Sequence, residues 1–189
     1  MDIRLELTGT SPMLMHNINL ADPDNEFTRE IKTYTDKRKK TEDDRRAIER
    51  LEWFGGLYTA NGQIVMPTGN IRKSFINAGK ISKQGTQVTR SLQFTDLHVP
   101  VAYDGPEDLD LLFKDPAFSN RAAVGISGKR TMRVRPQFNT WAIVADALLL
   151  EDVMDIDDLE RVARRAGLAE GLGDNRVNGY GRFTVRVVS

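Results

Sequence analysis

The chain has 189 residues, 40% of them hydrophobic, which is enough for one well-buried core or for a core with sizeable insertions. It contains no cysteine, which excludes disulfides, thiolate catalysis and cysteine-based zinc sites, and which suits a reducing cytosol. Its 27 lysines and arginines balance 27 aspartates and glutamates, and a formal net charge of zero argues against a generic histone-like cation.

The charges are nevertheless separated along the chain. Basic residues gather in the ranges 37–40, 129–135 and 176–186, and acidic residues gather in 104–115 and 151–160. A neutral chain with separated charges can still present one basic face. The N-terminus is charged and strand-like rather than a signal peptide, and no apolar run approaches the roughly 20 residues of a membrane span. We therefore expect a cytoplasmic protein.

The N-terminal part of the chain predicts one strand followed by two helices. Apolar and polar residues alternate over 3–8, which is typical of a half-buried strand. Apolar residues then recur at helical spacing over 24–34. Thr41 and Asp44 resemble a capping box and predict the start of a second helix, which the glycines at 55–56 end.

The middle of the chain predicts a hairpin, a helix and a strand. Asn61-Gly62, between two short apolar runs, is the strongest hairpin signal in the sequence. A helix over 70–83 follows, and the segment 84–128 is predicted to be a mostly irregular surface insertion. The strand that comes next places four polar residues on one face, because side chains alternate along a strand: Lys129, Thr131, Arg133 and Arg135.

Pro136 predicts a break, after which a longer apolar strand, a helix over 155–166 and a last strand over 182–188 follow. Without insertions the order is strand, helix, strand, strand, helix, strand. This order predicts an α+β, ferredoxin-like (RRM-like) βαββαβ core, with an antiparallel sheet backed by two helices. The two insertions are 17–66, which carries helices and the hairpin, and 84–128.

A glycine-rich loop over 171–183 lies between the last helix and the last strand. Its four glycines allow positive φ angles and a close approach of the backbone to a partner. Arg176, Tyr180 and Arg182 add two guanidiniums and an aromatic ring, a set suited to phosphates and bases. The alternative is an ordinary surface connection whose glycines only make turns.

This loop resembles the glycine-rich loop of the RAMP superfamily, which supplies backbone and RNA-processing subunits of CRISPR effector complexes. Two junctions are also similar to those of the family: Ser11-Pro12-Met13-Leu14-Met15 after the first strand, and Met66-Pro67-Thr68-Gly69-Asn70-Ile71-Arg72 at the first core helix. The resemblance covers the core and not the two insertions. It implies a modified RRM-like fold that binds single-stranded nucleic acid, often in a side-by-side helical assembly.

The sequence is also similar to a group of small phage or prophage proteins with a RAMP-like core. The runs that carry this similarity are Leu14-Met15-His16-Asn17, Lys37-Arg38-Lys39-Lys40-Thr41 and Gly55-Gly56-Leu57-Tyr58. On this basis we expect a single RAMP-like domain over 1–189, in which 17–66 is a thumb-like element that contacts a neighbouring copy or the bound strand.

Candidates for catalysis are few. RAMP ribonucleases of the processing type use a histidine, and backbone subunits that cleave use a loop aspartate, but His16, Asp22 and Asp24 lie in no matching motif. His16 is a weak candidate for a general base, although a histidine beside Asn17 at a strand end also suits a structural hydrogen bond. Asp22, Asp24 and Asp174 suit helix caps and turns as well as a magnesium ion. We expect no catalysis, metal or cofactor.

Positive charge points to nucleic acid instead. Arg133 and Arg135 would share a groove with Arg176 and Arg182 if their strands are neighbours, and each phosphate contact would release counterions. Tyr180 is the best candidate for an exposed stacking ring, whereas Trp141 begins an apolar run and is expected in the core. The candidate nucleic-acid-binding residues are Lys37, Arg38, Lys39, Lys40, Arg72, Lys73, Lys129, Arg133, Arg135, Arg176, Tyr180 and Arg182.

The hypothesis is a non-catalytic protein that binds single-stranded RNA or DNA and self-associates along the strand as a homo-oligomer. One alternative is a RAMP-type endoribonuclease with His16 as its base. Another is a mimic of a CRISPR backbone subunit that binds effector subunits and inhibits a host complex. The sequence does not distinguish RNA from DNA, because recognition of a 2′-hydroxyl leaves no readable motif.

Overall fold

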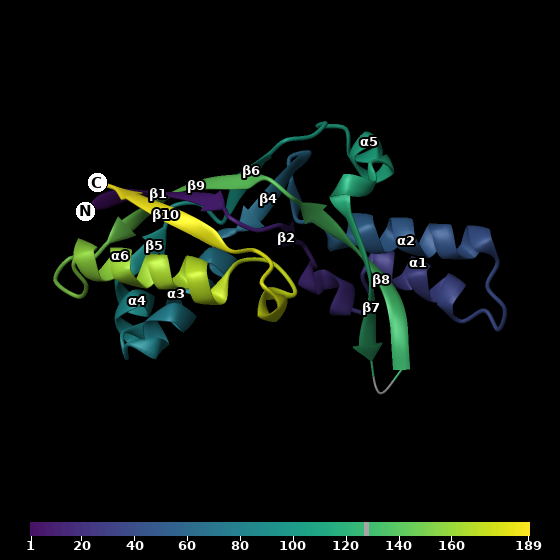
Figure 1. The fold of residues 1–189 in the computed structure, drawn as a ribbon, viewed down its shortest axis with the longest axis horizontal. Coiled ribbons are helices and arrows are strands. Elements are labelled where there is room, and N and C mark those ends of the chain that lie inside the picture. The colour runs from purple at the N-terminus through teal and green to yellow at the C-terminus, as the bar shows by residue number, and fades with distance from the viewer. Residues whose placement is uncertain (127–128) are drawn as a thin grey trace. The chain divides into compact units, whose positions relative to one another are not determined.

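The computed structural model of the chain describes residues 1–126 and 129–189, and of Ile126 and Lys129 it describes only the backbone. Within these ranges the chain forms two compact units (Figure 1). Unit 2 is built from two stretches that interrupt unit 1 in sequence. Unit 1 consists of Met1–Met13, Thr59–Asp104 and Asn139–Ser189, and unit 2 of Leu14–Tyr58 and Gly105–Phe138.

Unit 1 contains a seven-stranded sheet in the order β10-β1-β9-β6-β4-β3, with β5 paired to β9. Every pair in it is antiparallel. Its strands are β1 (Asp2–Gly9), β3 (Thr59–Ala60), β4 (Gln63–Pro67), β5 (Leu92–Phe94), β6 (His98–Tyr103), β9 (Trp141–Leu149) and β10 (Phe183–Val188).

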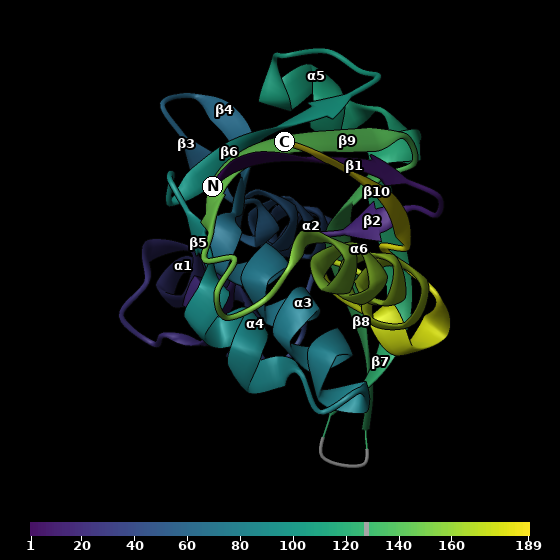
Figure 2. The same ribbon diagram turned by 90° about the vertical axis from the view of Figure 1, so that its left-hand side faces the viewer.

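Helices α3 (Thr68–Ile81) and α6 (Ile156–Arg165) lie on the same face of this sheet, and α4 (Gly85–Ser91) packs against α3 (Figure 2). The chain order β1-α3-β6-β9-α6-β10 combined with the sheet order β10-β1-β9-β6 is the ferredoxin-like arrangement. The structure therefore confirms the predicted α+β fold with an antiparallel sheet backed by two helices.

The second strand of this core is not the one that the sequence pattern indicated. The core strand is β6, whereas the polar strand beginning at Lys129 belongs to β8 (Lys129–Phe138), in a separate three-stranded sheet of order β2-β8-β7. The stretch 84–128 is also not irregular, since α4, β5, β6, α5 and β7 lie in it. Alternation predicts a strand but not its partner, and Pro100 inside β6 weakened the strand signal there.

Pro136 does not break its strand either. β8 continues through it to Phe138, with Pro136 opposite Ser119 of β7. On the other side the Pro136 carbonyl accepts a hydrogen bond of 3.0 Å from the Met15 N–H. The side of Pro136 that lacks an N–H thus faces β2 (Met13–Leu14), which is only two residues long and needs few ladder bonds.

The interior of unit 1 forms where the α3 stripe meets the sheet. Ile71, Phe75 and Ala78 are fully buried, as the helical spacing predicted. Trp141 is 2% exposed and donates its indole N–H to the Ser11 carbonyl at 2.9 Å, which confirms its place in the core. Gly9 lies against the Trp141 ring at a distance that leaves no room for a Cβ.

Unit 2 contains two longer helices, three short helices and a β-hairpin. Trp53 anchors it, fully buried and donating its indole N–H to the Phe118 carbonyl at 2.8 Å. The predicted capping box is present, with Thr41 accepting from the Asp44 N–H at 3.1 Å and Asp44 accepting from the Thr41 N–H at 2.9 Å. Its helices and hairpin strands are η1 (Ile18–Ala21), α1 (Glu26–Thr35), α2 (Glu42–Gly56), α5 (Leu109–Lys114), η2 (Pro116–Phe118), β7 (Ser119–Ile126) and β8.

None of the helices in the described ranges combines the length and apolarity that crossing a bilayer requires.

Candidate nucleic-acid interface

The glycine-rich loop of unit 1 connects the end of α6 to β10. After α6 the chain continues through one π-helical turn, Ala166–Glu170, and later forms a short turn at Arg176–Asn178. Between these turns and β10 the backbone reverses repeatedly, and it takes positive φ at Gly171, Gly173, Asn175, Gly179 and Gly181. Four of the five are glycines, because an L side chain is strained in this conformation.

Arg182 holds this loop together from inside. Its guanidinium donates to the Ala169 carbonyl at 2.6 Å and to the Arg176 carbonyl at 3.0 Å. Two carbonyls of the loop are thereby bound to one planar guanidinium, whose donors diverge in a fixed fork that a lysine ammonium does not have. Arg182 was predicted to bind phosphate, but the structure places its donors on the loop's own backbone.

The Ser11-Pro12 segment after β1 supports the loop from the other side. Ser11 Oγ accepts from the Arg182 backbone N–H at 2.8 Å and donates to the Gly179 carbonyl at 2.8 Å. The Gly181 N–H donates to the Pro12 carbonyl at 2.7 Å. Sequence reasoning marked Ser11-Pro12 only as a junction, because nothing local connects it to residues about 170 positions later.

The tip of the loop faces solvent. Val177 is 93% exposed, and Asn178 and Gly179 are exposed beside it. Arg176 is half-buried, and within the described ranges no hydrogen bond or ion pair engages its guanidinium. Tyr180 was predicted to be exposed and is half-buried.

The basic run in unit 2 is divided between structural and solvent-facing cations. Lys37 Nζ lies 2.5 Å from Asp44 Oδ1, and Lys40 Nζ donates to the Lys37 carbonyl at 3.2 Å. Hydrogen bonds from Lys37 and from the Thr41 backbone lower the pKa of Asp44 from 3.8 to about 2. Arg38 and Lys39 are exposed, and neither side chain has a partner among the described residues.

Of the two cations in the first turns of α3, Arg72 is bound within the protein and Lys73 faces solvent. Arg72 Nε donates to the Leu92 carbonyl at 3.2 Å, and its Nη2 donates to the Thr89 carbonyl. Arg72 therefore fastens α3 to α4 and β5 within unit 1. Lys73 is exposed and makes no such contact in the part of the chain that the structure describes.

The β8 cations lie in unit 2. Arg133 is ion-paired to Glu52 of α2, whose carboxylate also accepts the Val134 N–H at 2.9 Å. Arg135 is half-buried and lines a cavity with Arg133 and the exposed His16. Lys129 side-chain placement lies outside the described residues. Glu52 was not predicted as a partner of Arg133, because nothing in the sequence around it distinguishes it from the other acidic residues of α2.

The strands expected to form one groove belong to different sheets. β8 pairs with β2 and β7 in unit 2, and β10 is an edge strand beside β1 in unit 1. The prediction of a shared groove assumed that β8 and β10 are adjacent strands of one sheet, and the sheet topology does not show this pairing. A site that combines Arg133 or Arg135 with Arg176 therefore remains a prediction without support from strand pairing.

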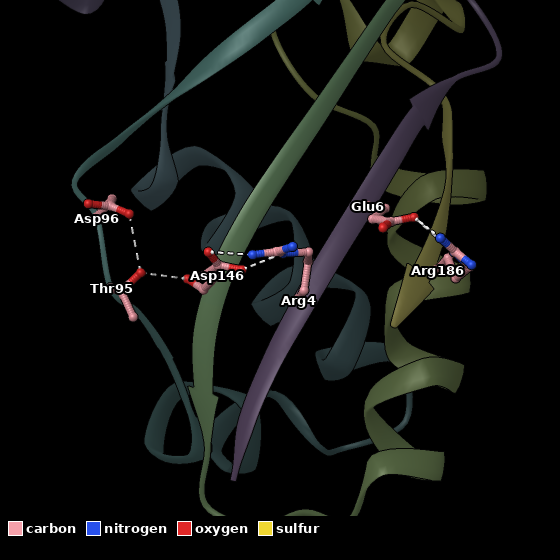
Figure 3. A network of polar contacts seen from close by, with 6 residues as sticks. All are labelled: Arg4, Glu6, Thr95, Asp96, Asp146 and Arg186. Carbon is pink, nitrogen blue, oxygen red and sulfur yellow. Dashed lines mark hydrogen bonds and ion pairs between the residues drawn. The ribbon is translucent and has the colours of Figure 1, made fainter. Parts of the chain in front are cut away.

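Among the described residues, strands β1, β9 and β10 carry no aromatic ring on the sheet face away from α3 and α6, where an RRM has its aromatic platform. In the fully described strands β1, β9 and β10 this face presents charged, aliphatic and threonine side chains, and ion pairs cross it (Figure 3). Arg4 Nε lies 2.7 Å from Asp146 Oδ1, which lowers the pKa of Asp146, and Arg186 Nη2 lies 2.6 Å from Glu6 Oε2. Base stacking on these three strands would have no ring to use.

Within the described ranges, no group of three or more histidine, cysteine, aspartate or glutamate side chains is placed to hold a metal ion.

Similarity to known proteins is found in structure and not in sequence. No family model matches the sequence, and no curated protein matches it. Among solved structures, the chain is similar to a chain of the "Cryo-EM structure of the Type III-B Cmr-beta bound to cognate target RNA", with a TM-score of 0.46 and 12% sequence identity. The match covers 100% of this chain, which spans 60% of the other chain's length.

Proposed function

We propose that the chain is a RAMP-like, non-catalytic protein that binds single-stranded nucleic acid, RNA or ssDNA, and self-associates along the strand. The observation that carries the proposal is the glycine-rich loop. Its shape is fixed by Arg182 and Ser11, while its tip at Val177 and the Arg176 guanidinium stay available. A loop that is ordered before binding loses little conformational entropy when a ligand arrives.

The chemistry of the loop suits a sugar-phosphate chain. Small residues at its tip let a ligand backbone come close, and the Arg176 guanidinium, which has no partner among the described residues, can donate two hydrogen bonds to one phosphate. Tyr180, on the same loop, supplies a ring for a base. Single-stranded nucleic acid offers phosphates and unstacked bases together, whereas a duplex keeps its bases stacked.

Arg38 and Lys39 extend the proposal to unit 2. Both are exposed at the tip between α1 and α2, and their charge is not consumed by an ion pair in the described ranges. Each such cation that neutralises a phosphate releases counterions and makes the affinity salt-dependent. Arg133 is not part of this set, because Glu52 already neutralises it.

Self-association follows from the edge of the unit 1 sheet. β10 pairs with β1 on one side only, so that its other side presents backbone donors and acceptors. A neighbouring copy that covers this edge would place successive glycine-rich loops along one strand. Size-exclusion chromatography with light scattering, with and without an oligonucleotide, tests this point: a monomer under both conditions would contradict it.

The binding test begins with protein purified without nuclease. The absorbance ratio at 260 and 280 nm reports a bound polymer, and digestion with RNase or DNase identifies it. Fluorescence anisotropy with single-stranded RNA and DNA of random sequence then gives the affinity as a function of salt. A protein that carries no polymer and binds neither oligonucleotide would contradict the proposal.

Matched variants locate the interface. We expect Arg176→Ala to weaken binding to every sequence and to reduce the salt slope by about 0.7 for each phosphate that is no longer neutralised. The double variant Arg38→Ala, Lys39→Ala should reduce the slope in the same way. Arg164→Ala, which removes an exposed arginine from the last turn of α6, is the control and should leave the slope unchanged.

A further inference from the structure

An open groove of about 250 Å³ lies between α3 and α4 in unit 1. The two helices approach closely because glycines face each other: a Cβ on Gly79 would lie 3.1 Å from the backbone nitrogen of Gly85. Both helices and their connection line this α3–α4 groove, with Ile76, Lys80, Lys83, Gly85, Thr86 and Thr89. The groove shares no residue with the glycine-rich loop over 171–183.

The two helices that form the groove carry positive charge only. Residues 53–95 contain no aspartate or glutamate, although 27 of the 189 residues in the chain are acidic. Within this stretch, α3, α4 and their connection supply five cations: Arg72, Lys73, Lys80, Lys83 and Arg90. None of the five is ion-paired in the described ranges, and the hydrogen bonds that they make go to neutral oxygens. Their charge is therefore available to an anion.

Lys83 has a backbone conformation that L residues rarely adopt. Its φ is 61°, directly after the C-cap of α3. The Lys83 N–H donates to the Lys80 carbonyl at 3.1 Å, and the Gln84 N–H donates to the Gly79 carbonyl at 2.8 Å. These two bonds form a Schellman motif, in which glycine is the usual residue at the left-handed position because it is not strained there. A lysine that is kept in spite of this strain indicates a use for its ammonium group at the rim of the groove.

We infer that the α3–α4 groove binds phosphate groups of single-stranded nucleic acid, as a contact site in addition to the glycine-rich loop. The inference rests on the proposed function. Lys80 and Lys83 supply ammonium donors on flexible stems and Thr86 supplies an exposed hydroxyl, which suit phosphate oxygens and carry no sequence preference. The groove is smaller than the roughly 300 Å³ at which sites that enclose a small molecule begin, and a strand that passes over it fits better than an enclosed ligand.

Anisotropy titrations of the full chain with a single-stranded oligonucleotide of random sequence test the groove. The double variant Lys80→Ala, Lys83→Ala should weaken binding about tenfold and reduce the salt slope by about 0.7 for each phosphate that is no longer neutralised. The double variant Lys114→Ala, Arg164→Ala removes the same charge from exposed positions outside the groove and should leave the slope unchanged. Equal effects of the two double variants would overturn the inference.

Lys83→Gly separates binding from folding. Glycine relieves the strain at a φ of 61°, so the melting temperature should stay the same or rise. Binding of the oligonucleotide should nevertheless weaken about fourfold, because one ammonium group is lost. A purely structural role of Lys83 would not combine these two results. Unchanged binding by Lys83→Gly would remove Lys83 from the site and overturn the inference.

Arg176→Ala distinguishes this inference from the proposed role of the loop. If Arg176→Ala weakens binding while Lys80→Ala, Lys83→Ala behaves like its control, the loop binds the strand and the groove does not. If only the lysine variant weakens binding, the groove is supported and the loop assignment fails.

Two other ligands decide the source of the phosphate. Tripolyphosphate should bind at least tenfold more weakly than the oligonucleotide in isothermal titration, because a short free anion releases fewer counterions than a strand. Equally tight binding of tripolyphosphate that is lost in Lys80→Ala, Lys83→Ala would assign the groove to a free phosphate compound and overturn the inference. Tighter binding to phosphatidylserine vesicles, lost in the same variant, would assign it to a lipid surface and overturn the inference as well.

Discussion

Glu52 of α2 binds Arg133 of β8 across 81 residues of sequence, and its second oxygen accepts the N–H of the next residue in that strand. The Glu52 side chain is 6% exposed and the Arg133 side chain 36%. The pair thus connects a helix to a hairpin in the interior of unit 2. It also consumes the charge that the sequence assigned to phosphate binding.

Arg133→Ala should therefore act mainly on stability. It leaves a nearly buried carboxylate without its cation, and we expect a decrease of about 2 kcal/mol in the free energy of unfolding, less than for a fully buried pair because Arg133 is partly solvated. Urea unfolding measures this. Arg46→Ala removes an exposed i,i+4 partner of Glu42 and should cost less than about 0.5 kcal/mol. Equal decreases in the two variants would contradict the structural role.

Arg182 should be required for the order of the glycine-rich loop. In Arg182→Lys the charge remains, but one ammonium cannot bond the Ala169 and Arg176 carbonyls in the same geometry. We expect faster amide hydrogen exchange over 171–181 and a stability decrease of about 1–2 kcal/mol. Arg186→Lys, on the exposed face of β10, is the control. Unchanged amide exchange in Arg182→Lys would show that the order of the loop does not depend on the Arg182 hydrogen bonds.

Two different physical reasons require a glycine at positions 179 and 181 of the loop. Both have positive φ, but a Cβ on Gly181 would lie 1.8 Å from the Leu172 carbonyl oxygen, whereas one on Gly179 meets nothing within 4 Å. Gly179→Ala should cost only the backbone strain of about 1 kcal/mol, and Gly181→Ala should cost several times more because the loop must open. The melting temperatures of the two variants measure this difference, and equal decreases in melting temperature would contradict the close approach of Gly181 to the Leu172 carbonyl.

Stability should depend on pH through Asp44. Its folded pKa is about 2, below the ordinary 3.8, so ionised Asp44 stabilises the fold. This contribution is complete above the ordinary pKa and disappears as the pH falls through the folded pKa. The stability difference between wild type and Asp44→Asn should be constant near neutral pH and should shrink as the pH falls from about 4 towards 2. A difference that grows on acidification would contradict the assignment.

His16 should have no catalytic role in RNA cleavage. It lies exposed beside Arg133 and Arg135, and the Tyr58 hydroxyl donates to its carbonyl at 3.2 Å. We expect labelled single-stranded RNA to remain intact with wild type and with His16→Ala, and the two proteins to bind it equally. Cleavage by wild type that is abolished in His16→Ala would instead identify a ribonuclease and contradict the non-catalytic proposal.

Local chemistry alone determined several elements correctly. Thr41 and Asp44 form the capping box because three residues of helix bring them together whatever surrounds them. Asn61 and Gly62 make the hairpin turn with φ angles of 51° and 76°, a conformation that this pair favours over most others. The buried stripe of α3 follows from helical spacing in the same way.

The positions of these elements in the fold were harder to predict from the sequence. The alternation of β8 is compatible with any sheet, and only the pairing of β6 with β9 and of β8 with β7 shows which strand belongs to the ferredoxin-like core. The candidate interface was the part predicted least accurately, because an arginine has the same sequence signature whether it faces solvent or a hydrogen-bond acceptor. Arg72, Arg133 and Arg182 all face acceptors inside the protein.

What the sequence determined by itself, then, are the elements that form within about four residues, together with the glycines that permit the loop over 171–181. Only the tertiary structure decided that Ser11 and Arg182 close this loop and that Glu52 neutralises Arg133. The reason is physical: hydrogen bonds and ion pairs between distant residues form after the chain has packed, and their geometry depends on every element between them.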